Sequence, residues 1–165
     1  MYSSNIVLIG MPGAGKSTIG VLLAKALGKT FLDTDLLIQA KEKRLLQEII
    51  DRHGIERFLE IEEAVIISLQ VKDTVVATGG SAIYSDKAIE HLKQNGVAVY
   101  LRLTYEEIEQ RIKNMASRGI VIGAGQSLHD LYRERTPKYE KNADLIIDCS
   151  ENSIEESVQS VLEKL

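Results

Sequence analysis

A glycine-rich segment near the start of the chain constrains its fold more than any other feature. Residues 10–17 read Gly-Met-Pro-Gly-Ala-Gly-Lys-Ser and match the pattern G-x-x-x-x-G-K-[ST] at every fixed position. The segment follows an apolar run, Asn5–Ile9, and precedes apolar residues at helical spacing between Ile19 and Leu27. A strand, a glycine-rich turn and a helix in this order are typical of a phosphate-binding loop in an α/β protein.

The chemistry of phosphate binding explains these residue types. Glycines let the backbone turn so that successive N–H groups face phosphate oxygens, and the N-terminus of the following helix adds the positive end of its dipole. The Lys16 ammonium would neutralise the β and γ oxygens, and the Ser17 hydroxyl would ligate Mg²⁺. The predicted nucleotide-binding residues are Gly13, Ala14, Gly15, Lys16, Ser17 and Thr18.

A strand-to-helix turn that binds no ligand is the alternative interpretation of this segment. With glycine at about 7% of average composition, and Lys, Ser and Thr taken as similarly common, the full pattern arises by chance in such a chain with a probability of roughly 1%. We therefore predict nucleotide binding. The motif alone leaves ATP hydrolysis, a GTP switch and phosphoryl transfer to a small acceptor open.

The rest of the chain alternates short apolar runs with helical periodicity. This alternation predicts an α/β fold, with a five-stranded parallel sheet flanked by helices. The expected strands are Asn5–Ile9, Thr30–Leu32, Thr74–Ala77, Val97–Leu103 and Asp144–Asp148.

Helix starts and one irregular segment complete the predicted architecture. Capping patterns begin helices after Ser85, Thr104, Ser127 and Ser153, and residues 45–70 predict two helices broken near Gly54. Three glycines interrupt residues 116–126, so we expect a mobile lid at about 116–127. The chain lacks repeats and linker composition, which predicts a single domain over residues 1–165.

Composition excludes several classes of partner. The net charge of −4 provides no broad basic face for nucleic acid, and no run approaches the ~20 apolar residues that span a bilayer. Cys149, the only cysteine, cannot form an internal disulfide, which favours a reducing cytoplasm, and its apolar surroundings favour a buried thiol. We expect a cytoplasmic monomer that binds a small molecule and neither nucleic acid nor membrane.

Two acidic residues, Asp33 and Asp35, follow the second expected strand, a position suited to Mg²⁺ and an acceptor hydroxyl. Together with three further motifs and the glycine-rich loop, this segment resembles the shikimate kinase family in order and spacing over nearly the whole chain. The segment with the two acids is Phe31–Ile38, and the three further motifs are Ala77–Gly80, Glu134–Tyr139 and Asn142–Asp144.

The resemblance implies a P-loop kinase fold, ATP and Mg²⁺ as cofactors, and a role for each matching residue. Asp33 would bind the magnesium hydration shell, and Asp35 would orient or deprotonate the acceptor hydroxyl. The remaining roles also follow from the motifs: Lys16 and Ser17 at the phosphates and metal, Gly79 and Gly80 lining the acceptor site, Arg111 against adenine, Arg118 as the lid arginine on the transferring phosphoryl group, and Arg135 at the acceptor carboxylate.

Three positions depart from the family pattern. The motif F-R-x-x-E, whose arginine forms half of a carboxylate clamp, has Leu59 at the arginine position, and Arg57 would lie on another face of the helix. Ser81 replaces the third glycine of the usual triple, and the lid has Gly119 after Arg118 where proline is usual. Loss of a hydrogen bond to a charged group costs about 1.5–3 kcal/mol, which would weaken shikimate binding by roughly 10- to 150-fold.

The leading hypothesis is an ATP-dependent phosphotransferase that converts shikimate to shikimate 3-phosphate. A kinase for a different small hydroxy acid or hydroxy amino acid, or a nucleotide-binding module without catalysis, are the alternatives. Structural roles also remain open for single residues: Asp33 and Asp35 as helix caps, Arg118 as a solvated loop residue, and Arg135 paired with a glutamate on its own helix.

Overall fold

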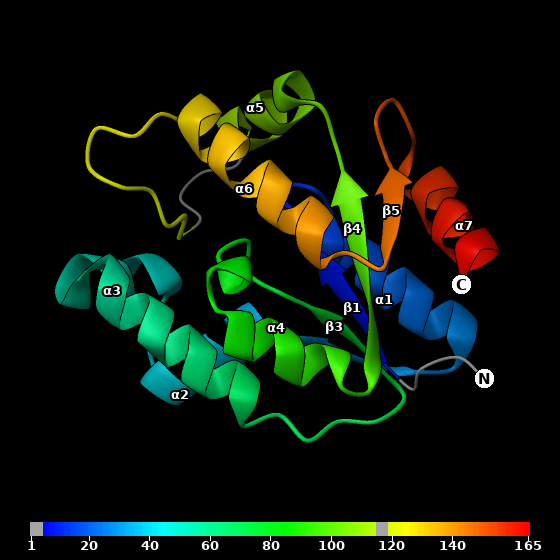
Figure 1. The fold of residues 1–165 in the computed structure, drawn as a ribbon, viewed down its shortest axis with the longest axis horizontal. Helices are drawn as coiled ribbons and strands as arrows, with labels where there is room; N and C mark the ends of the chain where they lie inside the picture. Colours follow the sequence, from blue (N-terminus) through cyan, green and yellow to red (C-terminus); the bar gives the residue numbers. More distant parts are fainter. Residues whose placement is uncertain (1–4, 115–118) are drawn as a thin grey trace.

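The computed structural model describes residues 5–114 and 119–165, which form one parallel sheet and the helices around it (Figure 1). The five strands lie in the order β2-β3-β1-β4-β5, and every adjacent pair is parallel. The strands are β1 (Asn5–Ile9), β2 (Thr30–Asp33), β3 (Thr74–Ala77), β4 (Gly96–Arg102) and β5 (Leu145–Asp148). The predicted α/β fold is confirmed, and each predicted strand is present with its ends within one residue.

The helices also match the capping patterns. Side chains of Ser85, Thr104, Ser127 and Ser153 accept hydrogen bonds from backbone N–H groups in the first turns that follow them. The helices are α1 (Lys16–Leu27), α2 (Thr34–Glu42), α3 (Leu46–Ile67), α4 (Asp86–Lys93), α5 (Tyr105–Lys113), α6 (Leu128–Asn142) and α7 (Ile154–Lys164), with a short 3₁₀ helix at Ala82–Tyr84.

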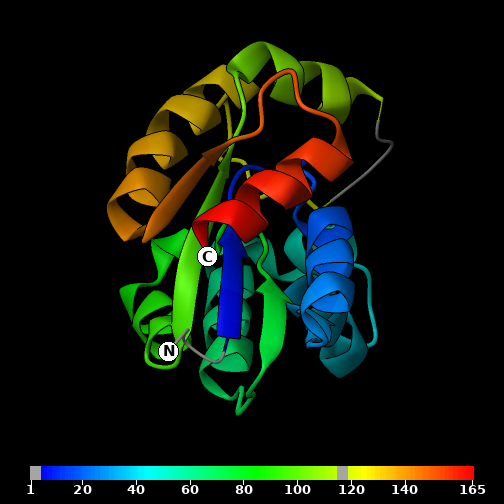
Figure 2. The same ribbon diagram turned by 90° about the vertical axis from the view of Figure 1, so that its right-hand side faces the viewer.

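Helices cover both faces of the sheet, as the turned view shows (Figure 2). Helices α1 and α7 pack side by side on one face, while α4 and α6 pack against β4 on the other. All residues of β1 and β3 are buried, as expected for strands covered on both sides. Gly20 lets α1 approach the sheet closely, because a Cβ there would lie 2.6 Å from the Phe31 ring.

Helices α2 and α3 build a second, smaller apolar cluster beside the main core. Its buried residues include Ile38 from α2 and Phe58 from α3. The chain bends inside α3 at Gly54, where φ is 79° and ψ is 169°, so the predicted break near this glycine is confirmed. The cluster fixes the helix pair in place next to the carboxyl ends of β2 and β3.

The segment from residue 119 to 127, the described part of the predicted lid, lies against this second cluster. Val121 is buried among the apolar residues of α2 and α3. Gly119 touches the first turn of α3 so closely that a Cβ would lie 2.4 Å from the Leu46 Cβ. Gly119 and Val121 are therefore packed against α2 and α3 in this structure, and lid mobility stays a prediction.

Two further sequence expectations concern single features. Cys149 is buried, as predicted, and burial raises the pKa of its thiol. Within the described ranges, no helix combines the length and the apolar character that crossing a bilayer requires.

Candidate active site

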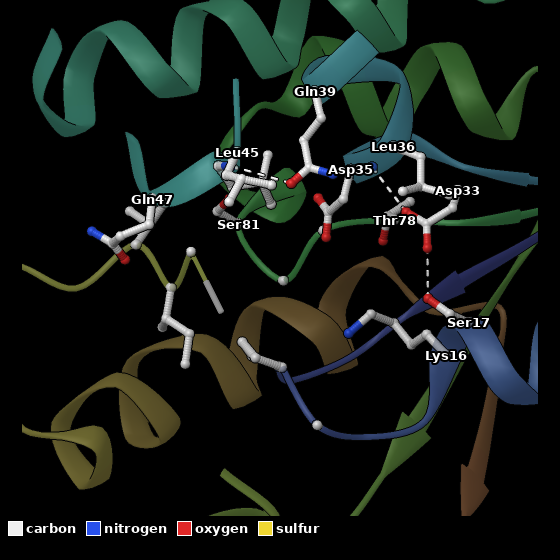
Figure 3. A pocket seen from close by; sticks show the side chains of 18 of the residues that line it. Lys16, Ser17, Asp33, Asp35, Leu36, Gln39, Leu45, Gln47, Thr78 and Ser81 are labelled. Atoms are coloured by element: carbon white, nitrogen blue, oxygen red, sulfur yellow. Dashed lines mark hydrogen bonds between the residues drawn. The ribbon is translucent and has the colours of Figure 1, made fainter. Parts of the chain in front are cut away.

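A cavity of about 460 Å³ opens at the carboxyl edge of the sheet (Figure 3). Its walls come from the glycine-rich loop, from α2 and the start of α3, from residues 78–81 after β3, from lid residues 119–121, and from Arg135 on α6. Lys16, Ser17, Asp33 and Asp35 all line it, so the structure brings together residues that the sequence analysis placed in one site. Leu36 and Leu45, both largely exposed, also line this cavity.

The glycine-rich loop holds its lysine in a defined position. Gly13 and Gly15 have φ values of 82° and 90°, which glycine tolerates far better than other residues. The Lys16 ammonium donates hydrogen bonds to the carbonyl oxygens of Gly10, at 2.6 Å, and Met11, at 2.8 Å. The phosphate oxygens of a bound nucleotide would compete with these carbonyls for the ammonium group.

Ser17 and Asp33 lie side by side. The Ser17 hydroxyl donates to Asp33 Oδ2 over 2.6 Å, while Asp33 Oδ1 accepts the backbone N–H of Asp35 at 2.9 Å (Figure 3). Asp33 therefore does cap α2, the structural role left open above, and its second oxygen still faces Ser17. A hydroxyl and a carboxylate are hard oxygen ligands that suit Mg²⁺, which keeps several waters and takes few protein ligands.

Asp35 approaches the turn that follows β3. Its Oδ1 lies only 2.6 Å from the point where a Cβ of Gly79 would stand, so residue 79 must be glycine for the carboxylate to approach this closely. The Gly79 N–H donates to the Thr34 hydroxyl at 3.2 Å, which ties the turn to the start of α2. Asp35 and the glycine turn thus form one wall of the cavity.

Arg135 forms the opposite wall and is almost fully buried, with 1% of its surface exposed. Its Nη2 donates to the Val121 carbonyl at 2.8 Å, and its Nε donates to the Tyr84 hydroxyl at 3.2 Å. Gly80 packs against the guanidinium, because a Cβ at that position would lie 2.9 Å from Nη1. The ion pairs found among the described residues do not include Arg135, so the predicted alternative of a pair with a helix neighbour is wrong.

The nucleotide side contains two further predicted residues. Arg111 on α5 donates from Nη1 to the Gly13 carbonyl at 3.2 Å, so its guanidinium lies against the glycine-rich loop. Ala14 is buried, and its N–H donates to the Met11 carbonyl at 3.1 Å. Arg118, the predicted lid arginine, lies outside the described residues.

Glu62 is a buried acid that the sequence analysis did not select. Its Oε1 accepts the Ser81 hydroxyl at 2.7 Å, while Oε2 has no hydrogen-bond partner within the described part of the chain. Burial raises its pKa from 4.5 to about 7; Asp35 adds to this rise, and Ser81, Arg135 and Lys16 oppose it. The sequence feature that could have identified Glu62 is its place as the final residue of the F-R-x-x-E pattern.

Leu59, which stands at the arginine position of the family motif, faces a different cavity from Lys16, Asp35 and Arg135. The residues that line the main cavity include Phe58 but not Leu59. Leu59 instead lines a smaller cavity of about 170 Å³ between α3, the 3₁₀ helix and α4, together with Glu62 and Tyr84. The residue at the clamp-arginine position therefore does not line the main cavity, because α3 turns this side chain toward α4.

The raised pKa of Glu62 predicts a pH dependence of stability. In the folded protein the carboxyl holds its proton up to about pH 7, whereas 4.5 is its ordinary value, so the native state binds more protons between these limits. Wild type should therefore lose stability as pH rises from about 4.5 to 7, relative to Glu62→Gln. Urea unfolding of both proteins at pH 5 and at pH 8 should show the free energy of unfolding shift by about 2.5 kcal/mol in favour of the glutamine variant between the two pH values.

The matched control is Glu60→Gln, which changes an exposed carboxylate paired with Arg57 on the same helix. Its stability relative to wild type should change by less than about 0.5 kcal/mol between the two pH values. A Glu62→Gln difference that is the same at both pH values would contradict the assignment of a proton to Glu62.

Comparison with known proteins places these residues in a family. A family model described as shikimate kinase matches residues 12–165. The shikimate kinase of Thiobacillus denitrificans is 38% identical over 153 residues, which cover 91% of this chain and 84% of that protein. That of Caldanaerobacter subterraneus subsp. tengcongensis is 35% identical over 161 residues, covering 96% and 94%.

A solved structure shows the same similarity in three dimensions. Shikimate kinase from Acinetobacter baumannii in complex with shikimate superposes with a TM-score of 0.84 at 35% identity, covering 98% of this chain and 92% of that one. The family model, the two relatives and the solved structure therefore all indicate the same family, and each match covers nearly all of the chain. On this evidence the chain belongs to the shikimate kinase family.

Proposed function

We propose that this chain transfers the γ-phosphoryl group of ATP to a hydroxyl of shikimate, forming shikimate 3-phosphate and ADP. The observation that carries the proposal is one cavity lined by Lys16 and Ser17 on the nucleotide side and by Asp35 and Arg135 on the acceptor side. The relatives named above are shikimate kinases, and one of them was solved in complex with shikimate.

The residues of the cavity divide the chemistry among them. The acceptor hydroxyl oxygen attacks the γ-phosphorus in line with the departing bridging oxygen of ADP, and its proton passes to the Asp35 carboxylate. Lys16 neutralises charge on the β- and γ-phosphate oxygens once they displace the Gly10 and Met11 carbonyls from its ammonium group. Most of the rate comes from this positioning and charge neutralisation.

Magnesium fits the oxygen ligands at the carboxyl end of β2. Ser17 would bind it through the hydroxyl, and Asp33 would hold its hydration shell, once their mutual hydrogen bond opens. When bound, the ion neutralises negative charge on the β- and γ-phosphates. Arg111 beside Gly13 is suited to contact adenine, and Arg118 is proposed to reach the transferring phosphoryl group when the lid closes.

Arg135 is the proposed partner of the acceptor carboxylate. It lines the cavity next to Gly80, opposite Asp35, so an acid held by the guanidinium can direct a ring hydroxyl toward Asp35. Gly79 and Gly80, which line the cavity, would border the acceptor site. We also propose that the protein is a monomer and that it is located in the cytoplasm.

A second acceptor class is favoured by one observation, the leucine at position 59. Without the second arginine of the clamp, a hydroxy acid or hydroxy amino acid other than shikimate becomes a candidate. ADP release measured by a coupled assay over a panel of hydroxylated acids, with shikimate included, tests both acceptors. Release with shikimate as the best substrate supports the proposal; release only with another acid identifies the second class, and none with any acid supports a non-catalytic nucleotide-binding module.

The role of Asp35 predicts a specific kinetic change. Asp35→Asn should retain ATP binding but lower kcat by about 10²- to 10⁴-fold, because the amide cannot accept the hydroxyl proton. Steady-state kinetics and a direct ATP titration measure the two effects. Asp51→Asn, at an exposed carboxylate on α3 that does not line the cavity, is the matched control and should leave kcat unchanged. Weaker ATP binding with normal kcat would instead assign Asp35 to the metal.

Position 59 tests the incomplete clamp. Leu59→Arg places a cation three and four residues before Glu62 and Glu63 on the helix, beside the unpartnered Glu62 oxygen. Leu59 does not line the main cavity, but Ser81 lines both cavities, and an arginine side chain is long enough to extend from the smaller one toward the other. If shikimate is the acceptor and the guanidinium extends past Ser81, the KM for shikimate should fall by about 10-fold, in line with a regained hydrogen bond to a carboxylate. Leu59→Met, which keeps an apolar side chain of similar volume, should leave this KM unchanged. An unchanged or higher KM in the arginine variant would show that the carboxylate does not approach α3.

A further inference from the structure

Arg135 carries a positive charge inside the protein with only neutral oxygen partners. Its identified acceptors are the Val121 carbonyl and the Tyr84 hydroxyl, and none of the ion pairs found among the described residues includes it. A buried cation without an ion-pair partner is costly unless its geometry is fixed by hydrogen bonds. The groups that fix this guanidinium therefore determine how well it can receive an anion.

Tyr84, at the end of the 3₁₀ helix, contacts Arg135 in two ways. Its hydroxyl accepts the Nε–H at 3.2 Å, and its ring lies beneath the guanidinium, with the Arg135 Cζ 5.2 Å from the ring centre. Nε and Nη2 are thus both bonded within the protein. The Nη1 side lies against Gly80 and lines the cavity.

Glu134 acts on Arg135 through the same phenol. The Tyr84 hydroxyl donates to Glu134 Oε1 at 2.5 Å, while Glu134 Oε2 accepts the Gln126 amide at 2.9 Å. Burial and this carboxylate raise the pKa of Tyr84 above its ordinary value of 10.0, so the hydroxyl keeps its proton and can accept from Arg135. The glutamate polarises the phenol without forming an ion pair with the arginine.

In this arrangement the orientation of the Arg135 guanidinium is fixed without its positive charge being neutralised. A direct carboxylate pair would fix the guanidinium but would also compete with an anionic ligand for its charge. The neutral phenol oxygen of Tyr84 is polarised by the Glu134 carboxylate, to which it is hydrogen-bonded. It fixes the guanidinium and leaves the positive charge free to attract an anionic ligand. Two described lid residues belong to the same network. The Val121 carbonyl accepts from Arg135 Nη2, and the Gln126 amide donates to Glu134 Oε2.

We propose that Tyr84, supported by Glu134, is a positioning residue that orients Arg135 for the carboxylate of the acceptor. The inference rests on the proposed function, because it assigns the acceptor carboxylate to Arg135. It adds a residue from the 3₁₀ helix whose side chain does not line the main cavity. With only one arginine of the clamp present, acceptor binding should depend strongly on the orientation of that arginine.

The kinetic test uses Tyr84→Phe, which keeps the ring beneath the guanidinium and removes only the hydroxyl. The KM for shikimate should rise about 3- to 10-fold, the range of one ordinary hydrogen bond, while kcat and the KM for ATP stay within about twofold. Tyr84→Leu, which also removes the ring, should raise the KM further. The matched control is Tyr105→Phe, because the Tyr105 hydroxyl likewise donates to a glutamate, Glu109, but on α5.

An NMR experiment tests the same contact between Tyr84 and Arg135 without enzyme turnover. The Nε–H resonance of Arg135, assigned by its loss in Arg135→Lys, should exchange with solvent about 3- to 10-fold faster in Tyr84→Phe than in wild type. Tyr105→Phe should leave this exchange rate unchanged. Equal exchange rates in wild type and Tyr84→Phe would overturn the positioning role.

The kinetic and NMR experiments together distinguish a failure of this inference from a failure of the proposed function. If wild type phosphorylates shikimate and Tyr84→Phe has the same KM, the positioning role fails while the proposed function stands. If wild type does not use shikimate, the proposed function fails, and the KM comparison is made on the acid that the panel identifies. In that case a KM rise on the new acid together with faster Nε–H exchange supports the role of Tyr84, and the absence of either rejects it.

Discussion

The parallel pairing of β2, β3 and β1 is the constraint on which the whole site depends. Register places Asp33 opposite Ala77, and Ala77 opposite Leu8, so the three strands end at nearly the same level. The glycine-rich loop, the two acids and the glycine turn leave the sheet from these neighbouring ends, where ligands of open parallel sheets bind. The short bond between Ser17 and Asp33 and the approach of Asp35 to Gly79 follow from this convergence.

Buried charge is the second organising feature of the site. Lys16 and Arg135 are both buried. Hydrogen bonds to two backbone carbonyls help to hold the lysine, and hydrogen bonds to a carbonyl and a phenol hold the arginine. For Arg135, these neutral partners satisfy the Nε and Nη2 donors, and no ion pair found among the described residues includes its guanidinium. Two buried cations that line one cavity favour anionic groups in their ligands, such as a nucleotide phosphate and an acceptor carboxylate.

Sequence patterns predicted the parts of the structure that local interactions determine. Strand runs, capping residues and the glycine-rich motif depend on near neighbours, and their positions were correct to within one residue. Leu59, Glu62 and Tyr84 could not be located in this way, because their environment depends on how α3 and the 3₁₀ helix pack together. Helical periodicity indicates that a residue is buried, but not which of two adjacent cavities it faces. The family motif identified position 59 as unusual, and only the structure showed that its side chain points toward α4.

The departures at positions 59 and 81 have a connected physical effect. A cation at position 59 would have lain one helical turn from Glu62, whereas here the Ser81 hydroxyl provides the hydrogen bond to this acid and leaves Oε2 without one. Burial raises the pKa of Glu62 to about 7, so near neutral pH part of this acid is protonated and the negative charge behind the glycine turn is reduced. The protonated form of Glu62 does not offset the charge of Arg135, so the absence of a cation at position 59 is accompanied by a reduced negative charge at position 62. The acceptor end of the cavity thereby stays suited to a carboxylate with a single arginine, and its affinity depends on how firmly Tyr84, Glu134 and the lid hold that residue.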